Sequence, residues 1–264
     1  MNLIRTYAAL ALFCLALPAA FADPKATKEE ARVITATSIL DDWQQMPDLA
    51  IPDRLLERAQ GIAVFPNVLK GAFIFGGRGG RGVVLVRDSA GRWSSPSFIT
   101  LAGGSFGFQV GVQSADVILV FTTRRGIEGI SGGKVTIGGD IAGAVGPVGR
   151  QMSGSTDLNL NAEVYSYSRA KGLFAGVSLD GSSMSIDYSA NEHYYGQADL
   201  LASDIFAGRI SNPPPSSQGL VAAVQKLVGS QQSAPAAAPA AAPRPEDKGM
   251  ESGAAATFPL DPPK

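Results

Sequence analysis

The first periodic pattern along the chain predicts an amphipathic helix over residues 25–46. Apolar side chains recur at helical spacing, with Val33, Leu40 and Trp43 among them, and prolines precede and end the segment. The polar face of this helix carries both charge signs. Two placements therefore stay open: the helix docks on the core, or it lies on a membrane surface with Val33, Leu40 and Trp43 as contacts. A second, shorter helix is predicted over residues 51–60.

Beyond Gly61 the pattern becomes strand-like. Residues 105–113 alternate strictly between apolar and small or polar side chains, which predicts a half-buried strand. Residues 116–122 form a continuous apolar run of strand length, which predicts a strand buried on both sides. Residues 173–179 and 184–188 predict a final hairpin around an Asp-Gly pair.

Glycine usage in the strand region indicates the fold class. Residues 61–149 hold 21 of the 31 glycines, and glycines inside strands mark bulges, strong coiling or close backbone approach. Short helices are predicted at residues 124–131, 191–195 and 200–206. We therefore predict a mainly β, α+β fold: a strongly coiled antiparallel sheet, barrel- or sandwich-like, with N-terminal helices and short C-terminal helices.

The two ends of the chain differ from its middle. Residues 1–22 read as a signal peptide, because a lone arginine precedes a short apolar run and a small-x-small cleavage site. Export to the periplasm or outer envelope is therefore expected, and the mature chain would hold no cysteine. Residues 212–264 are rich in proline and alanine, which predicts a disordered tail. The folded part would comprise the helix at 23–50 and one domain at 51–211.

The candidate chemistry centres on the glycine–arginine segment at residues 76–82. It lies between two apolar runs, and this predicts an anion-binding turn that combines backbone N–H groups with guanidinium forks. The alternative is a solvated hairpin turn whose arginines keep a sheet edge soluble. Residues 70–134 carry eight basic and three acidic side chains, whereas residues 135–210 carry four basic and eight acidic ones. The fold would either present one positive face or mix the two signs. The head-group candidates are Lys70, Arg78, Arg81, Arg87, Arg124, Arg125 and Lys134.

Several other chemistries are not supported by their sequence context. The glycine-arginine segment matches a dinucleotide fingerprint, but a strand follows it where that site needs a helix. Ser105 lies in a G-x-S-x-G string, yet it opens the alternating segment, and His193 is the only histidine that could serve as its base. We expect no metal site, no cofactor and no nucleic-acid partner.

One long run and several shorter motifs carry a family resemblance. The run IPDRLLERAQGIAVFPNVLKGAFIFGGRGGRGVVLVRD is followed by GRWSSPSFITLAGGSFGFQVGVQSADVILV, GPVGR, YSYSRAKGLFAGVSLDG and HYYG. Together they resemble the SYLF domain over residues 51–196. The resemblance implies a non-enzymatic lipid-binding module; eukaryotic members bind phosphoinositides and some bind actin.

The expected function is binding of anionic phospholipid or phosphoinositide-type head groups at a membrane surface in the bacterial envelope. The alternative is an interaction protein of the envelope that holds a protein partner, with the Pro/Ala tail as its tether. Actin is not expected as a partner of an exported bacterial protein.

Overall fold

The computed structural model describes residues 27–46, 50–72, 75–106, 111–146, 161–170, 173–174 and 179–229. The signal peptide predicted at residues 1–22 and the last 35 residues of the predicted tail lie outside the described residues. The helices are α2 (Lys28–Gln44), α3 (Asp53–Arg58), α4 (Arg124–Ser131), α5 (Tyr188–Tyr195), α6 (Ala202–Phe206) and α7 (Pro215–Gly229). The strands are β1 (Gly61–Ala72), β2 (Phe75–Val86), β3 (Ser97–Phe106), β4 (Gly111–Phe121), β5 (Lys134–Thr136), β6 (Gly143–Val145), β7 (Val164–Ala170), β8 (Leu173–Phe174) and β9 (Ser182–Ile186).

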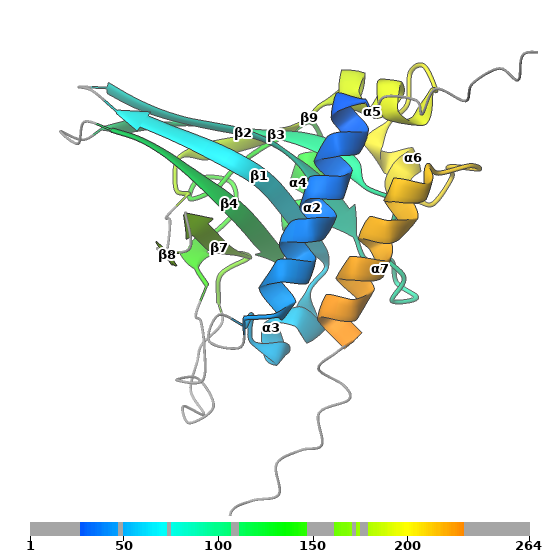
Figure 1. Ribbon diagram of the computed structural model, residues 1–264, viewed down its shortest axis with the longest axis horizontal. Coiled ribbons are helices and arrows are strands. Elements are labelled where there is room, and N and C mark those ends of the chain that lie inside the picture. Colours follow the sequence, from blue (N-terminus) through cyan, green and yellow to red (C-terminus); the bar gives the residue numbers. More distant parts are fainter. Residues whose placement is uncertain are drawn as a thin grey trace, which may run out of the picture.

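All of these strands form a single curled sheet. Its order is β5-β9-β3-β2-β1-β4-β7-β6, with β8 paired to β7. Neighbours are antiparallel except β6 and β7, which are parallel. Figure 1 shows the sheet curled into a half-barrel, with helices packed at one end of the long strands. The predicted α+β fold with a strongly coiled sheet is confirmed.

The sheet has two faces, each with its own core. On the α2 face, Val83 and Leu85 of β2 pack in a buried cluster with residues of α2 and α7. On the α4 face, Val84 and Val86 pack in a second cluster with Ile127 of α4. This division follows from the two-residue period of a strand, because consecutive side chains point to opposite faces.

The helices cover only part of the α2 face. Figure 1 shows α2 and α7 side by side across one end of the strands, while β1, β2 and β4 extend beyond them. We name that uncovered end, where β1 finishes and β2 begins, the open end of the sheet. Within the α2 face, Arg169 of β7 binds both Asp42 of α2 at 3.2 Å and Asp116 of β4 at 3.5 Å, which fixes the helix to the sheet.

Two strand predictions differ from the structure. Residues 105–113 are not one strand: β3 ends at Phe106 and β4 begins at Gly111, and the β1–β2 hairpin lies between these two strands in the sheet. The predicted hairpin at 173–188 is also wrong, since β8 pairs with β7 whereas β9 pairs with β3 and β5. Alternation along the chain identifies a strand, but it does not determine which other strand that strand pairs with.

The folded part extends beyond the predicted end at residue 211. Helix α7 places Leu220, Ala223, Val224 and Leu227 in the buried cluster of the α2 face. The segment was assigned to the tail because its proline-rich flanks dominate its composition. Burial of one apolar stripe against α2 is what makes it a helix of the domain. At the other end of the domain, α2 begins at Lys28, inside the predicted range 25–46, and Thr27 caps it: Thr27 Oγ1 accepts a hydrogen bond from Glu30 N at 3.1 Å.

Candidate functional site

The glycine–arginine segment at residues 76–82 is the middle of a strand, not a turn. It lies within β2, where Gly79 is opposite Leu69 of β1 on one side and opposite Ala102 of β3 on the other. Its backbone groups therefore belong to the ladders of a central strand, and none of its residues has a positive φ. The anion-binding turn is a wrong prediction, and so is the solvated hairpin turn that was its alternative.

The two arginines of the segment lie on opposite faces of the sheet. Arg81 is two residues from Val83 and shares the α2 face, whereas Arg78 is an even number of residues from Val84 and shares the α4 face. The glycines divide in the same way. A Cβ on Gly82 would lie 2.6 Å from Phe65 Cδ1 on the α4 face. A Cβ on Gly79, on the α2 face, would have Leu101 O at 3.7 Å as its nearest neighbour. One head group cannot contact both arginines.

Lys70 and Arg78 form the one directly opposed pair among the candidates. They are register partners in β1 and β2, so their side chains leave the α4 face side by side near the open end. Arg78 Nη2 donates a hydrogen bond to the carbonyl oxygen of Asp180 at 3.4 Å. On the other side of β2, Arg78 is opposite Gly103 of β3. Both cations are partly exposed. Two positive charges on one face of adjacent strands give this part of the sheet a locally positive surface.

Arg87 and Arg124 belong to a different place, far along the strands from the open end. They line a hollow of about 490 Å³ between the β2–β3 loop, α4 and α6, whose apolar lining includes Val86, Ile127 and Phe206. The acidic residues Asp88 and Glu128 line the same hollow. Its charges are therefore mixed in sign.

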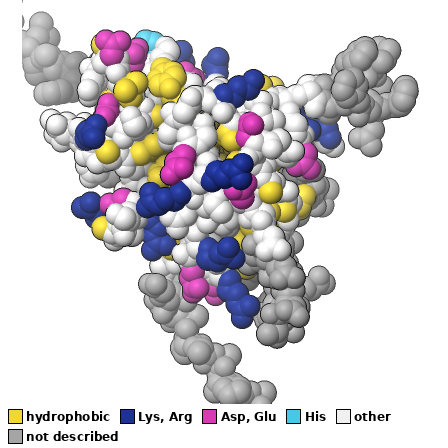
Figure 2. Space-filling view, turned by 180° about the vertical axis from the view of Figure 1, so that it is seen from behind, with side chains coloured by type: hydrophobic (Ala, Val, Ile, Leu, Met, Phe, Trp, Pro, Cys, Tyr) yellow, Lys and Arg dark blue, Asp and Glu magenta, His cyan; other side chains and the backbone are white. Residues whose placement is uncertain are grey.

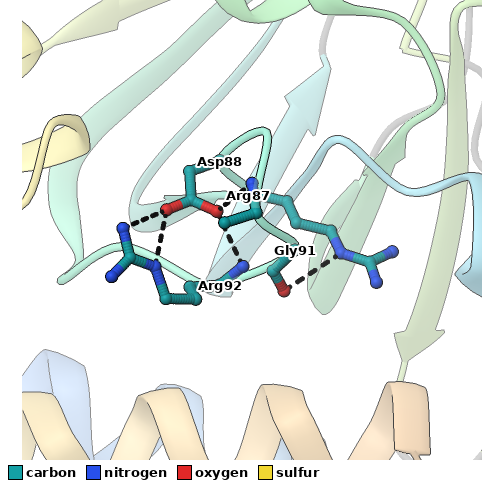
Figure 3. Close-up of polar contacts among 5 residues, drawn as sticks. Arg87, Asp88, Gly91 and Arg92 are labelled. Carbon is teal, nitrogen blue, oxygen red and sulfur yellow. Dashed lines mark hydrogen bonds and ion pairs between the residues drawn. The ribbon is translucent and has the colours of Figure 1, made fainter.

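Arg87 holds the β2–β3 loop in shape. Its Nε donates to Gly91 O at 3.3 Å, and its Nη1 donates to Glu57 O at 3.2 Å. In the same loop Arg92 binds the Asp88 carboxylate at 2.9 Å, as Figure 3 shows. Because two carbonyl oxygens already accept from the Arg87 guanidinium, its role in this structure is to fix the loop.

The remaining two candidates are exposed and lie apart. Arg125 of α4 is 4.0 Å from Glu163, which in turn accepts a hydrogen bond from Ala142 N. Lys134 begins β5 at the edge of the sheet, opposite Ser185 of β9. The seven predicted cations therefore do not form one site.

Charges of both signs are mixed over the side of the molecule turned away in Figure 1. Figure 2 shows Lys and Arg side chains interspersed with Asp and Glu on that side. The sheet order explains the mixing, because β9 and β7 of the acidic segment flank the basic strands β3, β2, β1 and β4. The ion pair of Arg169 with Asp116 joins the two segments directly. The sequence left open whether the fold presents one positive face or mixes the two signs, and this arrangement agrees with mixing.

The predicted membrane contacts of α2 are core residues in this structure. Val33 and Leu40 are 0% exposed and Trp43 is 1% exposed, and all three pack on the sheet. The prediction that these side chains contact a membrane is therefore corrected, and docking on the core is the placement observed. None of the helices in the described ranges has the length and apolar content needed to cross a bilayer.

Arg32 is a cation that the sequence reasoning missed. It precedes Val33 in α2, and its guanidinium lies 5.3 Å from the centroid of the Phe98 ring on the α2 face. Burial lowers the pKa of Arg32, the charge of Asp187 raises it, and the charge of Arg81 lowers it. In the sequence Arg32 is one of several charges on a helix of mixed sign, and only the packing of α2 brings it near β2.

A family model for the Las17-binding protein actin regulator Ysc84 matches residues 102–227. The match runs from β3 through the last buried residue of α7, so it includes the helix that the sequence reasoning left in the tail. The chain belongs to the SYLF domain family.

Three similar proteins come from a frog, a mammal and a yeast. SH3 domain-containing YSC84-like protein 1 of Xenopus laevis is 38% identical over 196 residues, which cover 72% of this chain and 58% of that protein. The Homo sapiens protein of the same name is 37% identical over 196 residues, with 72% and 56% covered. LAS seventeen-binding protein 3 of Saccharomyces cerevisiae (strain YJM789) is 36% identical over 191 residues, with 71% and 41% covered. The chain thus spans about half the length of the curated relatives it matches.

These names correct one prediction and support another. The expectation that actin is not a partner is contradicted, because the family is described as an actin regulator and its yeast member as Las17-binding. The names therefore indicate actin or another protein as the kind of partner that members of this family bind. The same descriptions name binding roles and no reaction, in agreement with a non-enzymatic binding function.

Proposed function

We propose that this SYLF domain binds anionic phospholipid head groups without catalysis, through Lys70 and Arg78 at the open end of the sheet. One observation carries the proposal: two cations are register partners on one face of adjacent central strands. Two cations held side by side can both bind a phosphate that lies between their side chains.

The expected strength of the interaction can be bounded from the number of charges. A Lys or Arg near an anionic lipid surface contributes about 1 kcal/mol, so the pair contributes about 2 kcal/mol, or roughly 30-fold in affinity. Because the attraction is Coulombic, binding should weaken steeply as ionic strength rises and the Debye length shortens.

Vesicle sedimentation tests this proposal. Wild-type protein should sediment with phosphatidylglycerol-containing vesicles and not with phosphatidylcholine vesicles. The double variant Lys70→Gln/Arg78→Gln should lose most of that binding. The matched control is Arg54→Gln/Arg58→Gln, which removes two exposed positive charges from α3 and should bind like wild type. Equal losses in both double variants would show that net charge, and not the Lys70–Arg78 pair, governs binding.

A protein partner is the second candidate function, and the names of the relatives favour it. The yeast relative is named for binding Las17, and the family model is described as an actin regulator. Co-sedimentation with filamentous actin in the absence of lipid tests it directly. Retention of the protein on filaments at high salt, together with no affinity for anionic vesicles, would replace the lipid proposal with this one.

The exported location is part of the lipid proposal. It rests on residues 1–22, whose composition is that of a signal peptide. Fractionation of cells that produce the full chain should place it with the periplasm or envelope. Recovery of the unprocessed chain from the cytoplasm would contradict this.

A further inference from the structure

A row of polar side chains crosses the α2 face beyond the helices. Arg81 of β2 is opposite Thr100 of β3, Thr100 is opposite Ser185 of β9, and Ser185 is opposite Lys134 of β5. All four share one face because directly opposed residues of antiparallel strands point the same way. The Thr100 and Ser185 hydroxyls lie 2.8 Å apart in a hydrogen bond. The row therefore has a cation at each end and two hydroxyl groups between them.

Beside this row of polar side chains, the α2 face of the sheet exposes glycine backbone. Gly79 and Gly104 lie on the same face, and both are exposed. A Cβ on Gly79 would have its nearest neighbour at 3.7 Å, and a Cβ on Gly104 would meet nothing within 4 Å. Within the described part of the chain, no side-chain atom lies within 4 Å of either Cβ position, which leaves space for a ligand beside the row.

Arg32 of α2 lies at the helical end of the same surface. Its guanidinium lies over the ring of Phe98, which is two residues before Thr100 on the same face of β3. The Nη1 atom of Arg32 is buried and has no hydrogen-bond partner within the described part of the chain. A buried guanidinium N–H without an acceptor is costly, and an oxyanion is its strongest acceptor.

Two carboxylates lie near Arg32: burial lowers the pKa of Arg32, and the charges of Asp187 and Glu29 both raise it. Asp187 Oδ1 accepts a hydrogen bond from Ala190 N and so caps α5. Glu29 is paired with Lys28 at 3.6 Å. Arg81 is close enough to Arg32 for its charge to disfavour the charged form of Arg32. The register gives the same neighbourhood: Arg32 lies over Phe98, Phe98 is opposite Val83, and Arg81 is two residues from Val83 on the same face of β2.

We propose that Arg32 and Arg81 bind one phosphate-type oxyanion of a polyhydroxyl compound, whose hydroxyl groups contact Thr100 and Ser185. Lys134 ends the row three strand spacings from Arg81, or about 14 Å, and can take a second anionic group of a longer ligand. This site lies on the opposite face of the sheet from Lys70 and Arg78, so it does not depend on the proposed lipid contact there. The shared chemistry is a phosphomonoester or phosphodiester on a polyol, from a soluble compound or a lipid head group.

The first test uses soluble probes and full-length protein. Chemical-shift titrations with glycerol 3-phosphate and with inorganic phosphate would report binding at residues of β3 and β9. Arg81→Gln should weaken both about tenfold, since a hydrogen bond to a charged group is lost. The control Arg54→Gln removes an exposed positive charge from α3 and should leave both affinities unchanged. Equal weakening by Arg81→Gln and Arg54→Gln, or no saturable binding of either probe, would overturn the proposal.

Two further variants examine the roles of the hydroxyl groups and of Arg32. Thr100→Val keeps the shape of the side chain and should weaken glycerol 3-phosphate while leaving inorganic phosphate unchanged. If Thr100→Val binds glycerol 3-phosphate like wild type, the polyol contact is refuted. Arg32→Lys keeps the charge but not the fork, and it should weaken both probes in a protein that still melts cooperatively. Unchanged binding of both probes by Arg32→Lys would remove Arg32 from the site.

Vesicles containing phosphatidylglycerol separate the two sources of the ligand. Loss of vesicle binding in Arg81→Gln as well as loss of glycerol 3-phosphate binding indicates a lipid head group at this site. Loss of glycerol 3-phosphate binding alone indicates a soluble compound. The lipid proposal for Lys70 and Arg78 is tested by a different variant, Lys70→Gln/Arg78→Gln, in vesicle sedimentation. Each proposal can therefore fail while the other holds.

Discussion

Two glycines in the same strand should respond in opposite ways to the same substitution. Gly79 and Gly82 both lie in β2, three residues apart, and therefore on opposite faces of the sheet. A Cβ added to Gly82 would lie 2.6 Å from Phe65 Cδ1 and closer still to the carbonyl oxygen of Val64. A Cβ added to Gly79 would have Leu101 O at 3.7 Å as its nearest neighbour, which is an ordinary van der Waals distance.

The magnitude follows from what must move. At Gly82 the neighbour is partly the backbone of β1, which cannot rotate away, and Phe65 is itself 0% exposed. Overpacking of this kind costs about 1–3 kcal/mol. At Gly79 the methyl group enters open space and reduces the entropy of the unfolded chain, so Gly79→Ala should be neutral or stabilise by about 0.4–1 kcal/mol.

Urea and thermal denaturation followed by circular dichroism would measure the difference. For a domain of this size, 1 kcal/mol corresponds to roughly 2–4 °C in Tm, so Gly82→Ala should melt several degrees below wild type. Gly79→Ala should melt at or above the wild-type temperature. If Gly79→Ala lost as much stability as Gly82→Ala, the segment would not be an extended central strand and the assignment of the two faces would fail.

Three further predictions concern the helices that close the domain. Asn191→Ala removes the acceptor of Phe98 N (2.7 Å) and the donor to Ser97 Oγ (3.1 Å), so it should cost about 1–3 kcal/mol in urea unfolding. The exposed neighbour variant His193→Ala should stay within about 0.5 kcal/mol of wild type, and equal losses would contradict the role of this contact. A chain ending at residue 211 lacks α7 and should be degraded by protease much faster than one ending at 229, whereas equal resistance would show that α7 is dispensable. Burial raises the pKa of Tyr194 to about 12, above its unfolded value of about 10, so the stability it contributes is complete below pH 10 and falls as pH rises through 12. Tyr194→Phe should flatten the fall in unfolding free energy between those pH values, and an unchanged slope would refute this assignment.

Local elements were predictable where a periodic pattern coincided with capping or turn residues. The α4 helix was predicted with the observed bounds, and α2 lies within the helix predicted at residues 25–46. The continuous apolar run at residues 116–122 is nearly all within β4, a central strand with neighbours on both edges. The segment at 105–113 misled because two strand ends alternate in phase across a connection, and periodicity cannot detect such a break.

The candidate site was predictable as a set of cations but not as an arrangement. Lys70 and Arg78 are eight residues apart in sequence, and only the register of the β1–β2 hairpin makes them opposed. Arg78 and Arg81 are three residues apart and were treated as one group, yet the strand period separates them. Arg32 and Arg81 belong to different elements, so their approach is a consequence of how α2 packs on Phe98.

By itself, the sequence determined the family and the curled α+β fold, which its high glycine content indicated. Each of these is a local or cumulative property of the chain: periodicity, composition and the order of motifs. The tertiary structure decided that the glycine–arginine segment is a central strand, that α7 belongs to the core, and that charges predicted to act together are divided between two faces. These outcomes depend on strand partners and helix packing between residues distant in the chain, and no pattern of neighbouring residues encodes them.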